Sequence, residues 1–231
     1  MSLAVAEPLP APDELLPDLA GEQALYFADE SDNNTGVFNA RAYHNAGHRV
    51  YACKATQGLT GSQPPYALRV NEAHAAGLKV IHYHFAEPAT GDPEGQMRFF
   101  LKTLEGHFIE DDRAVLDIEW PGLSREQTIG WAHSAFHYLH EHGHPGAPLY
   151  TGLSFLLGYG KELVPPSGEM WVADYGRPGE TVTQIWNEVG RSIPPGNLLA
   201  VQFTDGATGP EPHTLPGIDG PCDVSKLARL W

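Results

Sequence analysis

The segment LDIEW carries two carboxyl groups, those of Asp117 and Glu119, at a spacing that suits acid catalysis. The residues around it predict a strand over 113–120, and side chains two apart on a strand share a face, about 6.6 Å apart. Repulsion between two carboxylates raises at least one pKa, which keeps a proton available near neutral pH. A proton-holding carboxyl beside a second carboxyl is what glycosidic cleavage requires. Because D-x-E matches are common, a structural role for one of the two stays open.

A third carboxyl group follows an earlier predicted strand. The segment YFADESDNN places Asp29 at the C-terminal end of a strand over 24–29. In a parallel barrel the C-terminal ends of the strands form one mouth, so Asp29 would face the same space as the first pair. Asp32 is the rival candidate, and either aspartate could instead cap the helix that follows.

Histidines occur in two close pairs. In VIHYHFAEP, His82 and His84 share one face of a predicted strand and Tyr83 takes the other. A histidine there could bind sugar hydroxyls or orient a carboxylate, but a metal pair lacks further ligands at matching spacing. His140 and His144 lie around the end of a predicted helix without an H-E-x-x-H pattern, which favours a solvated helix end. We therefore expect no metal and no cofactor.

Aromatic residues fall at or just past several predicted strand ends, namely Tyr150, Trp171, Tyr175 and Phe203. Such rings can form flat apolar platforms for sugars or can pack in the core. Core packing is the better interpretation for Phe203, whereas both roles stay open for Trp171 and Tyr175.

Strand-like and helix-like segments alternate along the chain. Strands are predicted over 24–29, 49–56, 78–86, 113–120, 147–152, 169–174 and 198–204. Helices are predicted over 38–47, 66–76, 92–106, 124–143 and, more weakly, 181–189, with a cap at Asp92 and a capping box at Ser124 and Gln127. The alternation predicts a parallel sheet with crossover helices. A length of 231 residues and the lack of a G-x-G-x-x-G motif favour one α/β domain, an irregular TIM-like (β/α) barrel.

Two regions lie outside this alternation. Residues 1–23 contain four prolines and no basic or long apolar signal segment, so we expect an N-terminal arm or linker, with the barrel over 24–231. We therefore expect the protein to be made in the cytoplasm without a signal peptide. The lack of a long apolar run predicts no membrane partner. From Asp205 onward the sequence is turn-rich with little periodicity.

Charge and cysteine content argue against two classes of function, nucleic-acid binding and a site built on a C-x-x-C motif. The net charge is −15, with only 14 basic residues, which argues against a nucleic-acid partner. Cys53 and Cys222 form no C-x-x-C motif, and we expect both to be reduced.

Taken in chain order from about Leu25 to Leu230, the segments resemble the motifs of the family 25 glycoside hydrolases, the lysozyme-like muramidases. YFADESDNN is similar to the family's opening G-I-D-V-S-x-x-N/Q-G, VYACKATQG to F-V-x-x-K-A-T-E-G, and LDIEW to its D-x-E strand. AHAAGLKVIHYHF, APLYTG, MWVADYG, AVQFTD and GIDGPCDVSKL are similar to further motifs of the family.

The resemblance implies an irregular β/α barrel that cleaves the β-1,4 bond between N-acetylmuramic acid and N-acetylglucosamine in peptidoglycan. It implies Glu119 as the general acid, assisted by Asp117 and Asp29, with Asp223 in support. The nucleophile, a protein carboxylate or the acetamido group of the substrate, stays open. The residues implied in sugar binding are Tyr83, His84, Trp171, Tyr175 and Gln202.

The resemblance also implies where the protein would act. The partner would be the glycan strands of the bacterial cell wall, reached through phage lysis or delivery in a virion. The N-terminal arm could join a larger virion or lysis assembly.

Several positions depart from the family pattern and keep other functions open. Gln57 replaces a glutamate, Val201 replaces a tryptophan, Phe27 and Ala28 stand where the family has a glycine before the opening aspartate, and Asp29 is followed by Glu30. The alternatives are a non-catalytic glycan-binding or structural virion or tail protein on the same barrel, and a glycosidase for another polysaccharide.

Overall fold

The computed structural model describes residues 23, 25–31, 34, 36–120, 122–194 and 196–231. Nearly all of the predicted N-terminal arm, together with Asp32, lies outside the described residues. The boundary between arm and barrel therefore stays a prediction.

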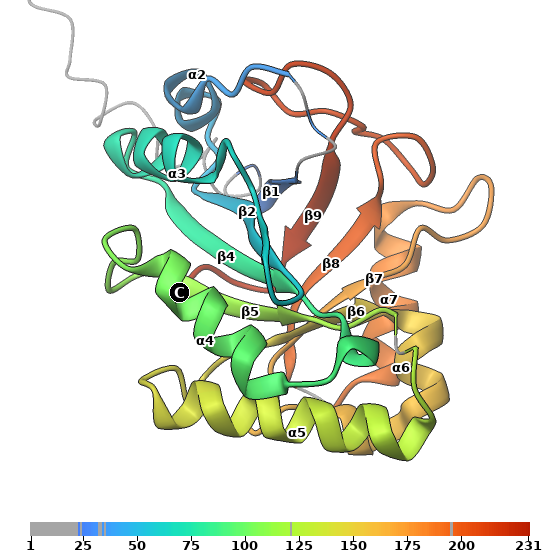
Figure 1. Cartoon of the computed structure of the whole chain (residues 1–231). Helices are drawn as coiled ribbons and strands as arrows, with labels where there is room; N and C mark the ends of the chain where they lie inside the picture. Colours follow the sequence, from blue (N-terminus) through green and yellow to red (C-terminus); the bar gives the residue numbers. More distant parts are fainter. Residues whose placement is uncertain (1–22, 24, 32–33, 35, 121, 195) are drawn as a thin grey trace, which may run out of the picture.

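Within the described residues, eight strands close into a barrel (Figure 1). In order around the barrel they are β1 (Tyr26–Glu30), β2 (Val50–Gln57), β4 (Lys79–Phe85), β5 (Arg113–Asp117), β6 (Leu149–Gly152), β7 (Met170–Ala173), β8 (Leu198–Thr204) and β9 (Asp223–Leu227). Neighbouring strands are parallel, except that β9 runs antiparallel to both β8 and β1. The short β3 (Gly61–Ser62) pairs with the end of β2. The predicted irregular α/β barrel is thus confirmed.

Helices cover the outside of the barrel (Figure 1). They are α2 (Ala40–Asn45), α3 (Tyr66–Ala75), α4 (Pro93–Leu104), α5 (Arg125–Glu141), α6 (Leu153–Tyr159) and α7 (Val182–Ser192), with 3-10 turns η2 (Pro88–Thr90) and η3 (Gly160–Leu163). None of the helices in the described part of the chain combines the length and apolarity needed to cross a membrane.

The predicted helix starts are confirmed by their hydrogen bonds. Asp92 accepts from the backbone N–H of Gly95 at 2.8 Å and so caps α4. Ser124 and Gln127 form a reciprocal capping box at the start of α5. These bonds satisfy N–H groups that have no partner inside the helix, which is why the local signals fix these boundaries.

Alternation along the strands produces two separate cores. One set of side chains, including Phe27, Ile81, Val115 and Trp171, fills the barrel interior. The other set points outward and packs beneath the helices. The strands are buried on both faces, as parallel strands covered by helices must be.

The structure differs from the sequence predictions at three elements. Strand β9 lies in the region predicted to be turn-rich, because a five-residue strand in which two residues are only partly buried carries little periodic signal. Helix α6 follows β6 directly, without a cap motif that would have revealed it. Strand β5 ends at Asp117, so Glu119 lies just beyond the strand.

The interior core predicts the effect of removing one of its rings. Phe27 is fully buried, with its ring centroid 5.2 Å from that of Trp171. We expect Phe27→Ala to lower the free energy of unfolding by about 3–5 kcal/mol, measured by urea denaturation, because it leaves a cavity in a closed barrel. Leu68→Ala is the control, since Leu68 is 63% exposed and its loss should change stability by less than about 0.5 kcal/mol. Equal losses in the two variants would contradict this account of the core.

Candidate active site

A pocket of about 140 Å³ opens at the C-terminal end of the barrel. It is lined by Asp29, Ser31, Lys54, Tyr83, Phe85, Asp117, Glu119, Tyr150, Trp171 and Asp223. Four of these residues carry carboxyl groups, and four carry aromatic rings. The three acidic residues that the sequence singles out near strand ends lie together in this pocket, joined by Asp223.

Strand alternation explains why these side chains meet. Asp29 and Asp117 lie at the C-terminal ends of β1 and β5. Both are at inward-facing positions, two residues after the interior residues Phe27 and Val115. Tyr83 is in phase with Ile81 on β4 in the same way. Because inward positions near the C-terminal ends of parallel strands converge, the fold places these groups around one space.

Asp29 receives two hydrogen bonds from neighbouring side chains. The Tyr83 hydroxyl donates to Oδ1 at 3.2 Å, and Nε2 of Gln202 donates to Oδ2 at 2.6 Å. Burial raises the pKa of Asp29 to about 7, against the lowering effect of these two donors and with a further upward effect of the Glu119 and Glu30 charges. Asp29 can therefore change its protonation state near neutral pH.

Asp223 lies directly opposite Asp29 across the antiparallel pair of β9 and β1. Its Oδ2 accepts a longer hydrogen bond of 3.3 Å from Nε2 of Gln202. Burial first, and then the charge of Asp29, raises the pKa of Asp223 to about 8. The sequence could not pair these two residues, because the strand that carries Asp223 was not predicted.

Asp117 and Glu119 both face the pocket, as their spacing predicts. Asp117 is 3% exposed, and no described residue donates a hydrogen bond to its Oδ1. Burial, followed by the charges of Glu119 and Asp29, raises the pKa of Asp117 well above its usual range. Glu119 is exposed at the pocket mouth, but desolvation of its carboxyl group still raises its pKa, against the lowering effect of Lys54.

Lys54 is the only basic side chain among the described residues that line the pocket, and the sequence analysis did not single it out. It is buried on β2, with its Nζ 5.8 Å from the centroid of the Phe85 ring and 3.4 Å from Oε1 of Gln57. A lysine at an inward position of an otherwise buried strand is the signal that could have identified it.

Three residues predicted to bind sugar, His84, Gln202 and Tyr175, lie outside the pocket lining. His84 faces outward, where its ring contacts Thr56 at 2.8 Å, Gln96 at 3.0 Å and the Phe100 ring of α4. Tyr83 and His84 are adjacent on one strand, so only one of them can face inward, and the prediction for His84 is wrong. Gln202 faces the interior, but it is fully buried and its amide contacts protein groups, so the prediction that it binds sugar directly is wrong.

The aromatic residues divide between core and pocket. Phe203 is fully buried against Tyr26 in the outer core, as predicted. Trp171 lies at the base of the pocket, almost fully buried, and its indole N–H donates to Ser225 at 2.9 Å. Tyr175 is half-buried outside the lining, and its hydroxyl donates to Oε1 of Gln202 at 2.9 Å.

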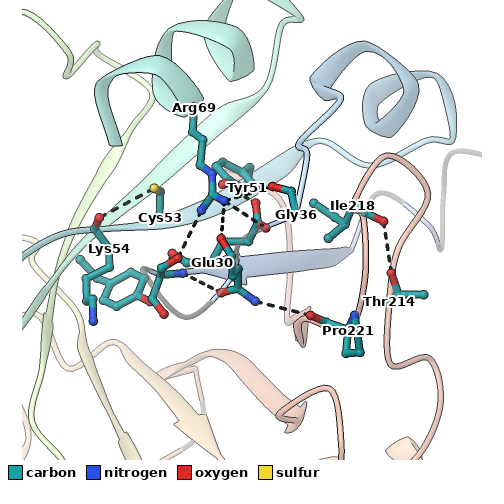
Figure 2. A network of polar contacts seen from close by, with 12 residues as sticks. Glu30, Gly36, Tyr51, Cys53, Lys54, Arg69, Thr214, Ile218 and Pro221 are labelled. Carbon is teal, nitrogen blue, oxygen red and sulfur yellow. Dashed lines mark hydrogen bonds and ion pairs between the residues drawn. The ribbon is translucent and has the colours of Figure 1, made fainter. Parts of the chain in front are cut away.

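Glu30, the unusual residue after Asp29, belongs to a structural network (Figure 2). It points away from the pocket, accepts a 2.7 Å hydrogen bond from the Tyr51 hydroxyl and lies 3.8 Å from the Arg69 guanidinium. Arg69, on α3, also donates to the backbone carbonyls of Asn34 and Gly36, in the segment after β1. The departure at Glu30 therefore supports the loop beside the site without adding a charge to the pocket.

The departures at Val201 and Gln57 also lie outside the pocket lining. Val201 faces the outer core, so a tryptophan at this position would not have lined the pocket. Gln57, at the end of β2, donates from Nε2 to the carboxylate of Glu87 at 2.7 Å. The carboxylate of Glu87 therefore lies beside position 57, and a glutamate at position 57 would repel it.

A second cluster of titratable groups lies outside the barrel and away from the pocket. His74 and His82 each approach Oδ2 of Asp112 at 3.0 Å, a set that could hold a metal ion. Asp112 also accepts backbone N–H groups of Val80 and Ile109, and the other ring nitrogen of His82 contacts the Tyr66 hydroxyl. Hydrogen bonds alone satisfy Asp112 and His82, so this cluster serves to join α3, β4 and β5.

The two cysteines are buried and free, as expected. Burial raises the pKa of each thiol to about 12, so the thiolate that a nucleophile requires is disfavoured.

Comparison with known proteins places this geometry in a family. The family model for glycosyl hydrolases family 25 matches residues 28–192. The autolytic lysozyme of Clostridium acetobutylicum is 24% identical over 195 residues, which are 84% of this chain and 53% of that protein. The chain thus spans about half the length of this curated relative.

Solved structures share the fold. The bacterial lysozyme from Streptomyces coelicolor superposes with a TM-score of 0.68 at 20% identity, covering 89% of this chain and 92% of that one. A family 25 glycosyl hydrolase from Bacillus anthracis gives 0.69 at 14% identity, covering 89% of each chain.

The crowded carboxyl groups predict how stability depends on pH. Their pKa values are higher in the folded than in the unfolded chain, so the folded chain binds more protons and stability decreases as pH rises. We expect these carboxyl groups to lower the free energy of unfolding between pH 4 and about 8, each on the order of 1.4 kcal/mol per unit of pKa shift. Buried histidines with lowered pKa values, such as His82 and His84, act in the opposite direction below about pH 6.5.

Denaturation at a series of pH values tests this expectation. Asp223→Asn should make the decline shallower, because it removes one titrating group and one like charge. Glu141→Gln removes an exposed carboxylate from α5 and should leave the wild-type slope. A pH dependence of Asp223→Asn identical to that of the wild type would contradict the assignment.

Proposed function

Because this chain belongs to glycosyl hydrolase family 25, we propose that it is a lysozyme-type enzyme that hydrolyses peptidoglycan. The bond cleaved is the β-1,4 linkage between N-acetylmuramic acid and N-acetylglucosamine. The single observation that carries the proposal is the group of four carboxyl groups and one lysine in a pocket walled by aromatic rings. Such a pocket supplies both a protonated acid and negative charge to one sugar unit.

Glu119 is the general acid of the proposed reaction. It stands at the exposed mouth, where the bridging oxygen of a glycan can reach it, and desolvation raises its pKa, which favours the protonated form that a general acid needs. The proton passes to the leaving oxygen as the glycosidic C–O bond breaks, and water then gives its hydroxyl group to the sugar carbon and its remaining proton to the carboxylate of Glu119. No metal or cofactor takes part in this scheme.

Asp29 and Asp117 lie deeper in the pocket than Glu119 and have different roles in the proposed reaction. Asp29, when ionised, stabilises the positive charge that develops on the sugar ring, because it is held in place by two donors in a water-poor site. Asp117 has a buried oxygen to which no residue of the described part of the chain donates, which suits a hydrogen bond from a polar hydrogen of the bound sugar. Trp171 and Tyr83 form apolar walls for the sugar face.

The proposed partner is the glycan strand of the bacterial cell wall, where the enzyme acts. Delivery by phage lysis or within a virion, and assembly through the N-terminal arm, remain predictions from the sequence.

Substitution of the acid tests the catalytic assignment. We expect Glu119→Gln to reduce the release of reducing sugar from purified peptidoglycan by at least about 10³-fold, because no proton reaches the leaving group. Folding should be retained, as judged by thermal denaturation, since the residue is exposed. The control Glu110→Gln removes an exposed glutamate before β5, at the opposite end of the barrel, and should retain full activity. Near-normal activity of Glu119→Gln would falsify the acid assignment.

The identity of the cleaved bond can be read from the products. Cleavage at the proposed bond leaves N-acetylmuramic acid at the new reducing end, so borohydride reduction followed by mass spectrometry should yield N-acetylmuraminitol. N-acetylglucosaminitol as the main product would place the cut at the other linkage. A folded protein that binds walls of several bacteria without releasing sugar would instead support the glycan-binding alternative.

A further inference from the structure

Gln202 uses the full hydrogen-bonding capacity of its amide beside the catalytic pocket. Its Oε1 accepts from the hydroxyls of Tyr150 at 2.7 Å and Tyr175 at 2.9 Å. Its Nε2 donates to Oδ2 of Asp29 at 2.6 Å and to Oδ2 of Asp223 at 3.3 Å. An amide offers two lone pairs and two hydrogens, so all four are matched.

The surroundings allow this amide one orientation when an aspartate is ionised. A flipped amide would place Oε1 against Asp29 and Asp223, and two oxygens without a hydrogen between them repel. In the observed orientation both tyrosine hydroxyls donate to Oε1, which fixes the two N–H bonds toward the carboxyl groups. Gln202 is also fully buried, so water does not compete for these hydrogens.

We propose that Gln202 is a positioning residue that keeps Asp29 ionised while Asp223 holds a proton, by donating its two amide hydrogens unequally to the two carboxyl groups. The importance of this state for turnover rests on the proposed function, in which ionised Asp29 stabilises the charged sugar ring.

The contacts of the two aspartates differ in the required direction. Asp29 receives a short bond from Gln202 and a second donor from Tyr83, whereas Asp223 receives one long bond from Gln202. Hydrogen bonds to the charged form favour ionisation, so Asp29 should lose its proton first. Burial raises the pKa of both carboxyl groups, but only at Asp29 do the donors Gln202 and Tyr83 lower it, whereas the charge of Asp29 raises the pKa of Asp223 further.

Other charged and titratable groups around Asp29 must be considered as well. Those on the elements packed against it include Glu30, Lys54, Tyr83, Asp117, Glu119, Tyr150, Tyr175, Cys222 and Asp223. Several of them are carboxyl groups, and an unassisted Asp29 would therefore tend to hold its proton. Gln202 and Tyr83 are neutral donors that offset this effect without bringing a positive charge, and Gln202 gives the shorter hydrogen bond.

The four hydrogen bonds of the Gln202 amide, which we call the Gln202 bridge, also determine the role of Tyr150 in the pocket. Its hydroxyl hydrogen is directed to Gln202, so toward a bound sugar Tyr150 presents a lone pair. Tyr150 should accept a hydrogen bond from a sugar hydroxyl and not donate one.

Removal of the bridge gives a specific test with two readouts. Gln202→Met keeps the side-chain length but removes both donors, and Tyr175→Phe weakens the bridge with less risk to folding. The titration of Asp29 is followed by carboxyl ¹³C NMR, and sugar release is measured from pH 4 to 10. We expect Gln202→Met to raise the Asp29 midpoint and the acidic limb of activity by about one pH unit or more, with Tyr175→Phe giving a smaller shift of the same sign.

Activity of Gln202→Met should return at higher pH, which a merely structural role would not produce. Gln184→Glu, at an exposed position on α7, controls for an altered glutamine and should shift nothing. Unchanged midpoints in both bridge variants, or an equal loss of activity at every pH, would overturn the proposal. A wild-type protein that releases no sugar would count only against the proposed function, because the NMR titration does not depend on turnover.

Discussion

Alternation of side chains along the strands of a closed barrel is the constraint on which the rest of this structure depends. Each strand sends every second residue into a narrow interior and the others under the helices. Near the C-terminal ends, the inward positions change from apolar residues such as Val115 to acidic ones such as Asp117. The site is therefore a continuation of the core in which the last layer of side chains is polar, held by the same backbone that packs the layers below.

That layer combines groups that would repel one another if they were all ionised. Burial raises the pKa values of all four acidic side chains of the pocket, and repulsion from neighbouring carboxylates raises those of Asp29, Asp117 and Asp223 further. The fold offsets part of this cost with Lys54 and with donors from tyrosine and glutamine side chains. A site that retains protons at neutral pH is thus less stable than a neutral core would be, and this cost is the source of its acid chemistry.

Local sequence signals were sufficient for most of the fold and for part of the site. Capping residues located α4 and α5, and a carboxyl at the end of an apolar strand identified Asp29 and Asp117. The incorrect or missing predictions concern residues whose orientation or contacts depend on pairing between strands that are distant in the sequence. His84 and Tyr83 are neighbours in sequence, but the direction in which each points depends on the register between β4 and the strands beside it. The contacts of Gln202 and the pairing of Asp223 with Asp29 join strands that are distant in the sequence, so no local pattern reveals them.

The antiparallel strand β9 has a consequence for the order in which the protein becomes competent. It pairs with β1, the first strand, and with β8, and in doing so it closes the barrel and brings Asp223 to Asp29. Contacts between such distant parts of a chain form late, because loop closure must precede them. During synthesis, a chain that has emerged only through β8 would have an open barrel edge and an incomplete set of carboxyl groups. The protein therefore gains its full set of acidic groups only once its last strand is in place, which couples chemical competence to the end of folding.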